Sequence, residues 1–255
     1  MASVIAVSNQ KGGVGKTTTT IHIASGFARK NLKVLCIDLD PCLSLSMHYR
    51  FGKRKARKDI SHLYKEKNVI LEDYILPTDV PQISLIHGSA FLYKLDKLLL
   101  ENNQLKVSIL KSRLKNLKNH FDYIVIDTAP GMNNLLFTSV FASDLIVIPM
   151  QADFLSMNGV SNFIDIIKAV EKLANQKFVY KFLINMYDPE TDPNQKALQI
   201  IQRKLSSILF QTVVSYSQDF KKACNQCKSL LEFQPYSEGA NQYIQLVEEI
   251  CDLLA

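Results

Sequence analysis

The sequence predicts an α/β protein with a doubly wound, mostly parallel sheet of about seven or eight strands and helices on both faces. Apolar β-branched runs recur along the chain, several of them lack the polar alternation of half-exposed strands, and helix-period segments separate them. The chain has 255 residues, 47% of them hydrophobic, which is enough for one sizeable core. No linker or internal repeat divides it, so a single domain over residues 1–255 is expected.

The expected strands and helices alternate along the chain. Strands are predicted at residues 3–8, 33–38, 83–87, 121–127, 145–150, 179–185 and 211–215. Helices with one apolar stripe are predicted at residues 17–30, 89–102, 105–119, 158–174, 194–209 and 239–254. Residues 41–81 are the least regular segment and are expected to form loops or short helices. No apolar run approaches the ~20 residues of a membrane helix, so no transmembrane segment is expected.

Charge is distributed unevenly between the two parts of the chain. The net charge is +6, but residues 1–120 hold 20 Lys and Arg against 9 Asp and Glu, whereas residues 121–255 hold 10 against 15. The basic part indicates a polyanionic partner such as nucleotide phosphates, nucleic acid or anionic lipid, without distinguishing among them. Five Cys without a secretory leader favour the reducing cytoplasm.

The strongest local signal is a glycine-rich loop between the first predicted strand and the first predicted helix. It reads Asn9-Gln10-Lys11-Gly12-Gly13-Val14-Gly15-Lys16-Thr17-Thr18. Glycines let successive backbone N–H groups point inward, the helix N-terminus adds partial positive charge, and Lys16 supplies a full charge. The usual pattern G-x-x-x-x-G-K-[ST] is not met, because Gln10 stands at its first glycine, and Lys11 adds a second lysine. The loop therefore predicts a phosphate-binding site of a deviant form.

Together with this loop, further segments resemble the ParA/MinD family of deviant Walker-A ATPases, and more closely its ParA (Soj-like) branch. The matching segments are residues 38–41, 124–131, 151–154 with 159–161, 183–188, and 237–240 with Tyr243. The resemblance runs nearly end to end. It implies a P-loop NTPase fold and a Mg²⁺-dependent ATPase that binds ATP and ADP, hydrolyses ATP slowly, and is stimulated by dimerisation and by a partner.

The resemblance also implies which residues bind nucleotide. They are Lys11, Gly12, Gly13, Val14, Gly15, Lys16, Thr17, Thr18 and Asn185. Lys16 is expected to contact the β- and γ-phosphates, and Thr18 to lie near the α-phosphate. Asn185 is expected to contact adenine, although an asparagine at a strand end is also an ordinary turn residue. Lys11 is expected to reach the phosphates of the partner in an ATP-dependent sandwich homodimer, with a solvent-facing lysine as the alternative.

Magnesium and the attacking water are expected beside the same loop. The Thr17 hydroxyl is expected to bind Mg²⁺, and Asp127 to hold the ion through a water; a helix-capping or solvated carboxylate is the alternative for Asp127. Asp38 is expected to contact the groups that bind Mg²⁺ and not the ion itself. Asp40 is expected to orient the attacking water, which makes Lys11, Lys16 and Asp40 the catalytic residues.

Two basic segments are candidates for contact with nonspecific DNA. They are the run Lys53, Arg54, Lys55, Arg57 and Lys58, and the group Lys221, Lys222 and Lys228. DNA-binding members of the family carry an arginine-containing segment after the seventh strand, but residues 215–220 contain no arginine here and include Asp219. DNA binding is therefore expected to be weakened, and solvated basic surfaces explain both segments equally well.

The leading hypothesis is a ParA-type ATPase of chromosome or plasmid partition, whose ATP-bound homodimer holds nonspecific DNA until a ParB-like partner stimulates hydrolysis. It would act in the cytoplasm, at the nucleoid where DNA is bound. One alternative is a MinD-like switch that positions a protein cluster or acts at a membrane, but residues 246–255 carry three acidic residues and no Lys or Arg, which disfavours anionic lipid. Another is an iron–sulfur carrier ATPase that uses Cys224 and Cys227, a pair that two ordinary reduced thiols also explain.

Overall fold

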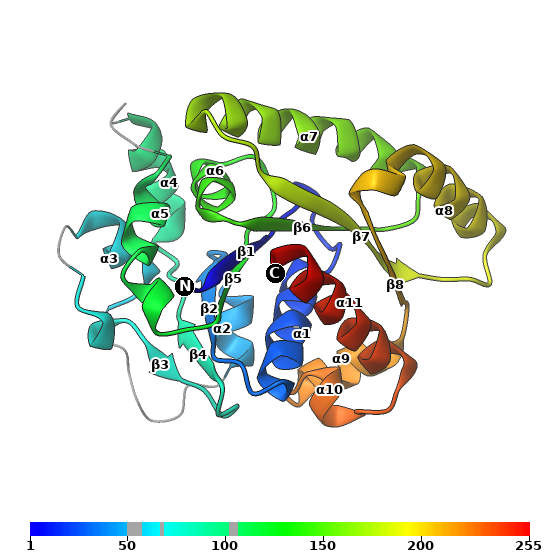
Figure 1. Ribbon diagram of the computed structural model, residues 1–255, viewed down its shortest axis with the longest axis horizontal. Coiled ribbons are helices and arrows are strands. Elements are labelled where there is room, and N and C mark those ends of the chain that lie inside the picture. The colour runs from blue at the N-terminus through cyan, green and yellow to red at the C-terminus, as the bar shows by residue number, and fades with distance from the viewer. Residues whose placement is uncertain (50–57, 67–68, 102–106) are drawn as a thin grey trace.

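The computed structural model describes residues 1–49, 58–66, 69–101 and 107–255, which form an eight-stranded sheet with helices on both faces (Figure 1). The strands are β1 (Ser3–Val7), β2 (Val34–Leu39), β3 (Leu76–Pro77), β4 (Ile83–Ile86), β5 (Tyr123–Thr128), β6 (Leu145–Met150), β7 (Val179–Tyr187) and β8 (Leu209–Ser215). Their order is β3-β4-β2-β5-β1-β6-β7-β8, and every neighbouring pair is parallel except β3 with β4. The predicted fold class is confirmed.

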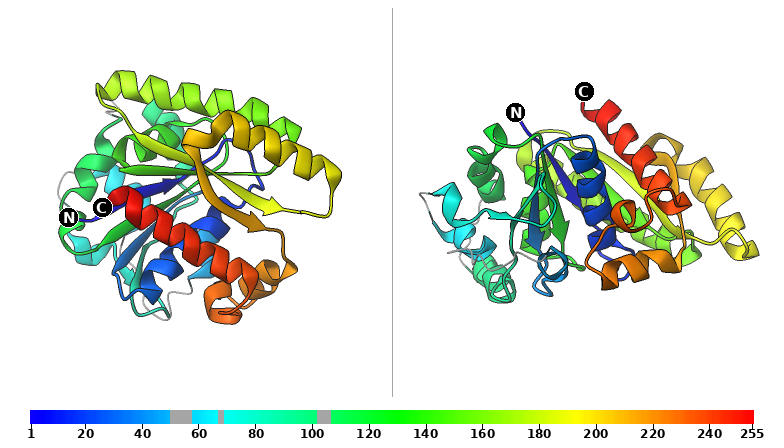
Figure 2. Two further views of the ribbon diagram at one scale, coloured as in Figure 1. Left: turned by 45° about the vertical axis from the view of Figure 1, so that its right-hand side comes forward. Right: turned by 90° about the horizontal axis from the view of Figure 1, so that it is seen from below.

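Helices cover both faces of this sheet. They are α1 (Lys16–Arg29), α2 (Ser44–His48), α3 (Ile60–Lys65), α4 (Leu92–Glu101), α5 (Ile109–Leu114), α6 (Asn134–Ala142), α7 (Phe154–Ala174), α8 (Asp192–Leu205), α9 (Gln218–Asn225), α10 (Leu230–Phe233) and α11 (Glu238–Leu254), with the 3₁₀ helices η1 (Leu71–Asp73), η2 (Leu117–Asn119) and η3 (Ser206–Ile208). One face carries α1, α2 and α9 to α11, and the other carries α3 to α8 (Figure 2). No helix in the described ranges is long and apolar enough to cross a membrane.

Successive residues of the central strands are buried in opposite layers. In β2, Cys36 belongs to the core beneath α1, whereas Leu35 and Ile37 belong to the core beneath α3 to α5. Burial on both faces explains why the strand lacks polar alternation. Parallel pairing places Asp38 opposite Asp127, so the carboxyl ends of β1, β2 and β5 meet at one edge of the sheet. Doubly wound sheets bind ligands outside this edge.

Several predicted helix boundaries are wrong. The helix expected at residues 194–209 is α8, which ends at Leu205 because η3 leads directly into β8. The helix expected at residues 105–119 is reduced to α5 followed by η2, and the one expected at residue 89 begins at Leu92. The helix expected at residue 158 begins four residues earlier as α7, because the Asp153 carboxylate caps it by accepting the Ser156 N–H at 2.6 Å.

The sequence pattern misses other elements for physical reasons. Helix α6 is buried on most of its sides and therefore lacks the polar face that an amphipathic pattern requires. The eight-residue α9, the four-residue α10 and the two-residue β3 are too short to repeat a period. The segment expected to be irregular, residues 41–81, holds α2, α3, η1 and β3 in its described part.

Candidate functional site

The glycine-rich loop lies at the edge where β1, β2 and β5 end. Gly13 and Gly15 have φ angles of 73° and 87°, which a residue with a Cβ rarely adopts, and Gly15 caps α1. A Cβ at Gly15 would also collide with the Asn185 amide. The Nδ2 group of Asn185 donates to the Val14 carbonyl at 2.9 Å, so β7 braces the loop from the side. The loop is thereby held in a curved conformation that only glycine permits.

Lys16 and Thr17 follow the loop and face the acidic strand ends. The Lys16 residue is 7% exposed, and its Nζ donates to the Lys11 carbonyl at 3.0 Å. Burial lowers the pKa of Lys16, and the nearby Asp127 and Asp40 carboxylates oppose that shift. The Thr17 hydroxyl donates to Asp127 Oδ2 at 2.7 Å. The Thr17 hydroxyl thus contacts a carboxylate, and the predicted roles of Lys16 and Thr17 stay predictions.

Asp127 is buried completely at the end of β5. Its carboxylate accepts hydrogen bonds from the hydroxyls of Thr17 and of Thr20, the latter at 3.3 Å. Burial, followed by the negative charge of Asp38, raises the pKa of Asp127 well above its usual range. The described residues contain no group of three or more His, Cys, Asp or Glu placed to hold an ion directly. A buried carboxylate beside the Thr17 hydroxyl suits a cation that keeps several waters, as Mg²⁺ does.

Asp38 and Asp40 have different surroundings. The buried Asp38 carboxylate accepts the Ser46 N–H at 2.8 Å, the Ser46 hydroxyl at 2.6 Å and the Asp40 N–H at 3.0 Å. It therefore anchors α2 and positions the backbone of Asp40, and burial raises its pKa. Asp40 accepts the Cys42 N–H at 2.8 Å and lines a cavity of about 240 Å³ together with Gly131. The metal-related role of Asp38 and the water-orienting role of Asp40 stay predictions.

The two lysines of the loop point to different partners. The Lys11 side chain is 41% exposed, and its Nζ lies 3.0 Å from Asp153 Oδ2, 3.3 Å from Ser156 Oγ and 3.4 Å from Gln151 Oε1. Burial alone would raise the pKa of Asp153, but the bonds from Lys11 and Ser156 outweigh it and lower the pKa. Neither Asp153 nor Ser156 was among the predicted site residues. Their spacing at a helix start was the local signal that could have indicated this contact.

A second cavity, of about 330 Å³, lies next to the loop between β7, β8 and α9. Thr18 and Asn185 line it together with Phe220, Cys224 and Tyr243. The structure therefore brings the residue predicted near the α-phosphate and the residue predicted at adenine to one cavity. A partly aromatic cavity beside a phosphate loop suits a planar heterocycle.

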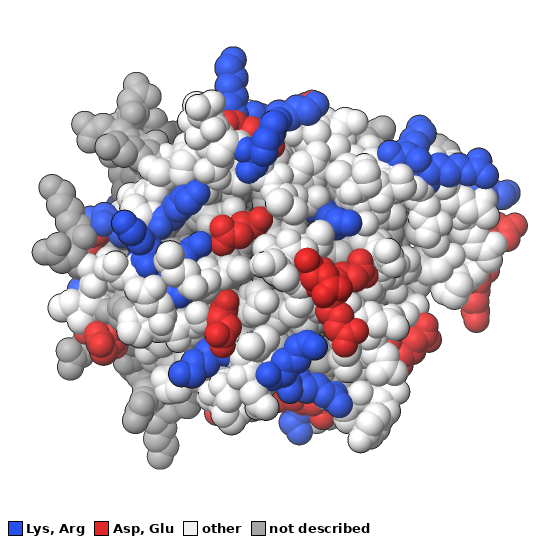
Figure 3. Space-filling model, in the orientation of Figure 1, with Lys and Arg blue, Asp and Glu red and all other residues white. Residues whose placement is uncertain are grey.

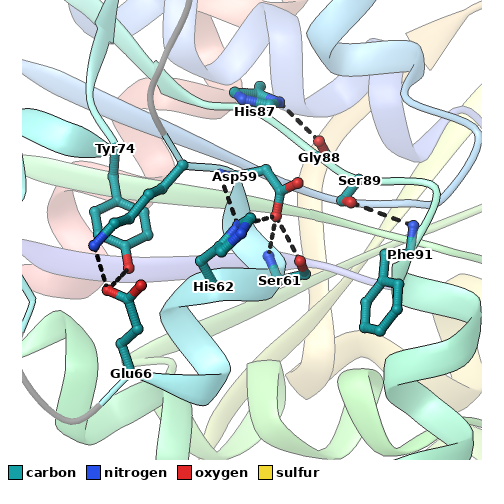
Figure 4. Close-up of polar contacts among 10 residues, drawn as sticks. Asp59, Ser61, His62, Glu66, Tyr74, His87, Gly88, Ser89 and Phe91 are labelled. Atoms are coloured by element: carbon teal, nitrogen blue, oxygen red, sulfur yellow. Dashed lines mark hydrogen bonds and ion pairs between the residues drawn. The ribbon is translucent and has the colours of Figure 1, made fainter.

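Most of the predicted basic run lies outside the described residues, namely Lys53, Arg54, Lys55 and Arg57. Lys58 is described, and its Nζ lies 2.7 Å from Glu66 Oε2 and 3.6 Å from Asp73 Oδ2. Figure 4 shows the same Glu66 carboxylate accepting the Tyr74 hydroxyl. Lys58 thus pairs with carboxylates of its own chain, so less of its positive charge is available to contact a DNA phosphate.

A serine, a histidine and an aspartate also meet at the start of α3 (Figure 4). Asp59 Oδ1 accepts the Ser61 N–H at 2.8 Å and the Ser61 hydroxyl at 2.6 Å, and it lies 3.0 Å from His62 Nδ1. The serine hydroxyl therefore bonds to the carboxylate rather than to the imidazole. This arrangement caps a helix and does not activate a nucleophile.

Lys221, Lys222 and Lys228 are all exposed, on α9 and in the turn after it. The Lys222 Nζ pairs with Asp219 Oδ1 at 2.7 Å, so Asp219 neutralises a neighbouring lysine. Because of this ion pair, the segment around α9 offers less free positive charge than its number of lysines suggests. Elsewhere, Figure 3 shows basic side chains along α5, α7 and α8 and acidic side chains over α11.

Cys224 and Cys227 lie at the end of α9, and neither is in a disulfide. Within the described part of one chain, no third metal-binding side chain of the His, Cys, Asp or Glu type joins them. Zinc and iron–sulfur sites use four protein ligands in their closed forms. One chain thus supplies at most half of such a site at this position.

Comparison with known proteins agrees with this architecture. A protein-family model described as an AAA domain matches residues 2–180. The chain is 27% identical over 251 residues to the sporulation initiation inhibitor protein Soj of Bacillus subtilis, with 98% of both proteins covered. A variant of Cyanothece McdA in complex with ATP has a similar structure, with a TM-score of 0.86, 22% identity and coverage of 99% of this chain and 96% of that one. A putative plasmid partition protein of Borrelia burgdorferi bound to AMPPNP gives a TM-score of 0.83, 23% identity and 99% coverage of both chains.

Proposed function

The chain belongs to the ParA/MinD family of deviant Walker-A ATPases, and we propose that it is a ParA-type ATPase of chromosome or plasmid partition. In this proposal the ATP-bound chain forms a sandwich homodimer that binds DNA without sequence preference. Hydrolysis of ATP to ADP and phosphate, stimulated by a ParB-like partner, switches the dimer off. The protein acts in the cytoplasm, at the nucleoid when DNA is bound.

The observation that supports a dimer is that Lys11 and Lys16 have different partners. Lys16 is buried against its own loop, whereas the half-exposed Lys11 Nζ rests on Asp153. An exposed ion pair is worth only about 0–1 kcal/mol, so Lys11 loses little when it leaves Asp153. A charge-assisted bond to a phosphate of a second copy, at about 1.5–3 kcal/mol, outweighs that loss.

The residues of the site fit a magnesium nucleotide. The curved glycine backbone, the N-terminus of α1 and the buried Lys16 suit phosphate oxygens, and the space where a Cβ would stand at Gly13 is open. Thr17 and Asp127 would hold Mg²⁺, which supplies charge neutralisation on the phosphates when bound. Asp40 would orient the attacking water at the mouth of the site. These roles follow from burial and donor type and are part of the proposal.

A protein cluster is the second candidate cargo, with DNA binding lost. The pairing of Lys222 with Asp219 favours it, because the ion pair removes positive charge where DNA-binding relatives carry arginine. In that case the ATP-dependent dimer would remain, and its surface would bind protein instead of DNA.

The test is ATP-dependent binding of the Asp40→Ala variant to nonspecific duplex DNA, compared with ADP and repeated across a salt series. The substitution removes the proposed water-orienting carboxylate and should trap an ATP-bound dimer. Tight, salt-sensitive binding with ATP alone supports partition through DNA. A dimer that binds no DNA refutes partition through DNA binding and favours a protein cargo. A variant that stays monomeric with ATP refutes the proposed ATP-dependent dimer. Lys11→Ala in the Asp40→Ala background is the matched control, which should bind nucleotide without dimerising.

A further inference from the structure

We propose that Cys224 and Cys227 form a dithiol–disulfide site whose oxidation lowers nucleotide binding in the cavity beside Thr18. The inference rests on the proposed function in one respect, namely that the base of the nucleotide occupies this cavity. The site takes small disulfides such as oxidised glutathione as its reaction partner.

The backbone between the two cysteines has the geometry of a tight turn. The Cys227 N–H donates to the Cys224 carbonyl at 2.9 Å, and Gln226 between them has φ −97° and ψ 6°. A turn closed by such a bond brings its first and fourth Cα atoms within about 7 Å. Disulfides span Cα separations of about 4.4–6.8 Å, so the pair lies at a separation that a disulfide can bridge.

The turn is held in place by further contacts. The Lys228 N–H donates to the Ala223 carbonyl at 3.1 Å, which closes a second bond around the same turn. Cys227 itself has a positive φ of 53°, a conformation that side-chain-bearing residues seldom adopt. The cysteines are therefore presented in a defined arrangement, and not on a freely moving loop.

Cys224 belongs to the wall of the candidate nucleotide cavity. It lines the cavity together with Thr18, Asn185 and Phe220. The Phe220 ring packs against His22 at 5.1 Å between centroids, and His22 Nδ1 donates to the Thr18 carbonyl at 2.7 Å. A new covalent bond at the end of α9 would therefore shift the contacts that connect α9 with the first turns of α1, the helix that begins at the phosphate loop.

Both thiols are placed for reaction with a small molecule. Cys224 is exposed, Cys227 is half-buried, and neither is in a disulfide. Partial burial, followed by the nearby Cys227 sulfur, raises the pKa of the Cys224 thiol, which reduces the share of the reactive thiolate and slows attack by Cys224. The pair is a dithiol in this structure, and an oxidising glutathione ratio is needed to convert it.

The exchange needs no group beyond the named oxidant. A thiolate of one cysteine attacks a sulfur of oxidised glutathione, which forms a mixed disulfide and releases one glutathione. The second cysteine then attacks the protein sulfur of that mixed disulfide, which forms the Cys224–Cys227 bond and releases the second glutathione. The protein gives up two protons and two electrons, and one glutathione disulfide becomes two glutathione thiols.

The test begins with the full-length reduced chain in glutathione buffers of increasing oxidised fraction, without nucleotide. Intact mass and differential alkylation should locate one disulfide, between Cys224 and Cys227. Titration with a fluorescent ATP analogue and Mg²⁺ should then show at least a roughly tenfold loss of affinity in the oxidised protein, which corresponds to about 1.4 kcal/mol. The Cys227→Ser variant cannot form this disulfide, and the fraction of it that carries no glutathione adduct by intact mass should keep its affinity in the same buffers. Cys42→Ser, which removes another exposed thiol, should respond like the unchanged chain.

Three results would overturn the inference. One is the recovery of mixed glutathione adducts only, and another is a mapped Cys224–Cys227 disulfide with unchanged affinity. The third is stoichiometric retention of added Zn²⁺ by the reduced chain that is lost in Cys224→Ser, which would assign the pair to metal. Failure of the reduced chain to bind the ATP analogue refutes the proposed ATPase, and it is distinguishable because disulfide mapping uses no nucleotide.

Discussion

The two ends of helix α1 are built from different interactions. At its N-terminus, the Thr17 hydroxyl donates to the buried Asp127 carboxylate, and the charge of Lys16 interacts with that carboxylate without a direct contact. Further along the helix, the His22 ring stacks on Tyr243 at 4.6 Å, and Gly26 allows Val247 to approach so closely that a Cβ would lie 2.6 Å from it. Figure 2 shows α1 between the sheet and the C-terminal helices.

This difference separates binding from stability. Buried charges at the first end cost folding free energy until a ligand compensates them, because charged groups lose hydration on burial. Aromatic and aliphatic packing at the second end stabilises the fold directly. Changes at the first end should therefore alter nucleotide binding with little loss of stability, and changes at the second end should lower the stability of the fold.

The largest effect is expected for Lys16→Ala. Loss of the buried loop cation should weaken ATP binding more than about a hundredfold, or about 3 kcal/mol, because charge-assisted phosphate contacts disappear. Calorimetric titration measures the loss, and thermal unfolding of the nucleotide-free protein should show no lower Tm. Lys11→Ala is the matched control, which should retain most of the affinity and lose ATP-dependent dimerisation. Equal losses of affinity in both variants would contradict the different roles of the two lysines.

Tyr243→Ala tests the packing end of the helix. Removal of this fully buried ring should lower the free energy of unfolding by about 3 kcal/mol. Tyr243→Phe should cost only about 1 kcal/mol, because it removes the 3.2 Å contact between the Tyr243 and Thr19 hydroxyls and keeps the ring. Denaturant titration measures both values. A Tyr243→Ala variant of unchanged stability would show that the comparison of the two ends is wrong.

His22 should make the packing end sensitive to acid. Burial lowers the pKa of His22 to about 4, and its Nε2 accepts the Leu230 N–H at 2.9 Å, which requires the neutral ring. A pKa lowered in the folded state gives stability that is present above the unfolded value near 6.5 and is lost as pH falls toward 4. The loss should approach roughly 3 kcal/mol at pH 4. Denaturant titrations of the protein and of His22→Gln across this range should converge as pH falls; parallel curves would contradict the assignment.

Asp127→Asn should show the opposite pH dependence at the charged end. The pKa of Asp127 is raised, so the stability linked to its protonated form is present below the unfolded value and is lost as pH rises through the folded one. The variant should thus gain stability over the unchanged chain as pH rises, by about 1 kcal/mol at neutral pH. Unfolding titrations at several pH values measure this gain. Mg²⁺-dependent ATP binding should weaken in the same variant, and an unchanged Mg²⁺ dependence would exclude the metal role.

The smallest effect is expected for Asp219→Asn, outside both ends. Release of Lys222 from its ion pair should add one phosphate contact to DNA binding by the ATP-bound protein and steepen the log–log salt dependence by about 0.9. Fluorescence anisotropy with labelled duplex DNA across a salt series measures the slope. Lys222→Gln in the same variant should reverse the change. An identical slope in all proteins would place DNA contact elsewhere or exclude it.

The seven longer strands, the phosphate loop and the identity of its lysines, threonines and carboxylates could all be predicted from the sequence. These features depend on local causes. A strand buried on both faces must be continuously apolar, and a loop whose backbone curves around phosphate needs glycines at positions such as Gly13 and Gly15. Such requirements can be recognised within a few neighbouring residues.

The partners of the site residues could be identified only in the folded chain. Lys11 contacts Asp153, which lies 142 positions further along the chain, and Lys58 is occupied by Glu66 and Asp73. The Asp38 carboxylate holds α2, and Cys224 lines the cavity that begins at Thr18. Periodicity and motifs describe what each residue is and which face of its element it occupies. The partner of a charged or polar side chain depends on which distant segments the folded sheet brings to the same edge, and no local pattern encodes that distance.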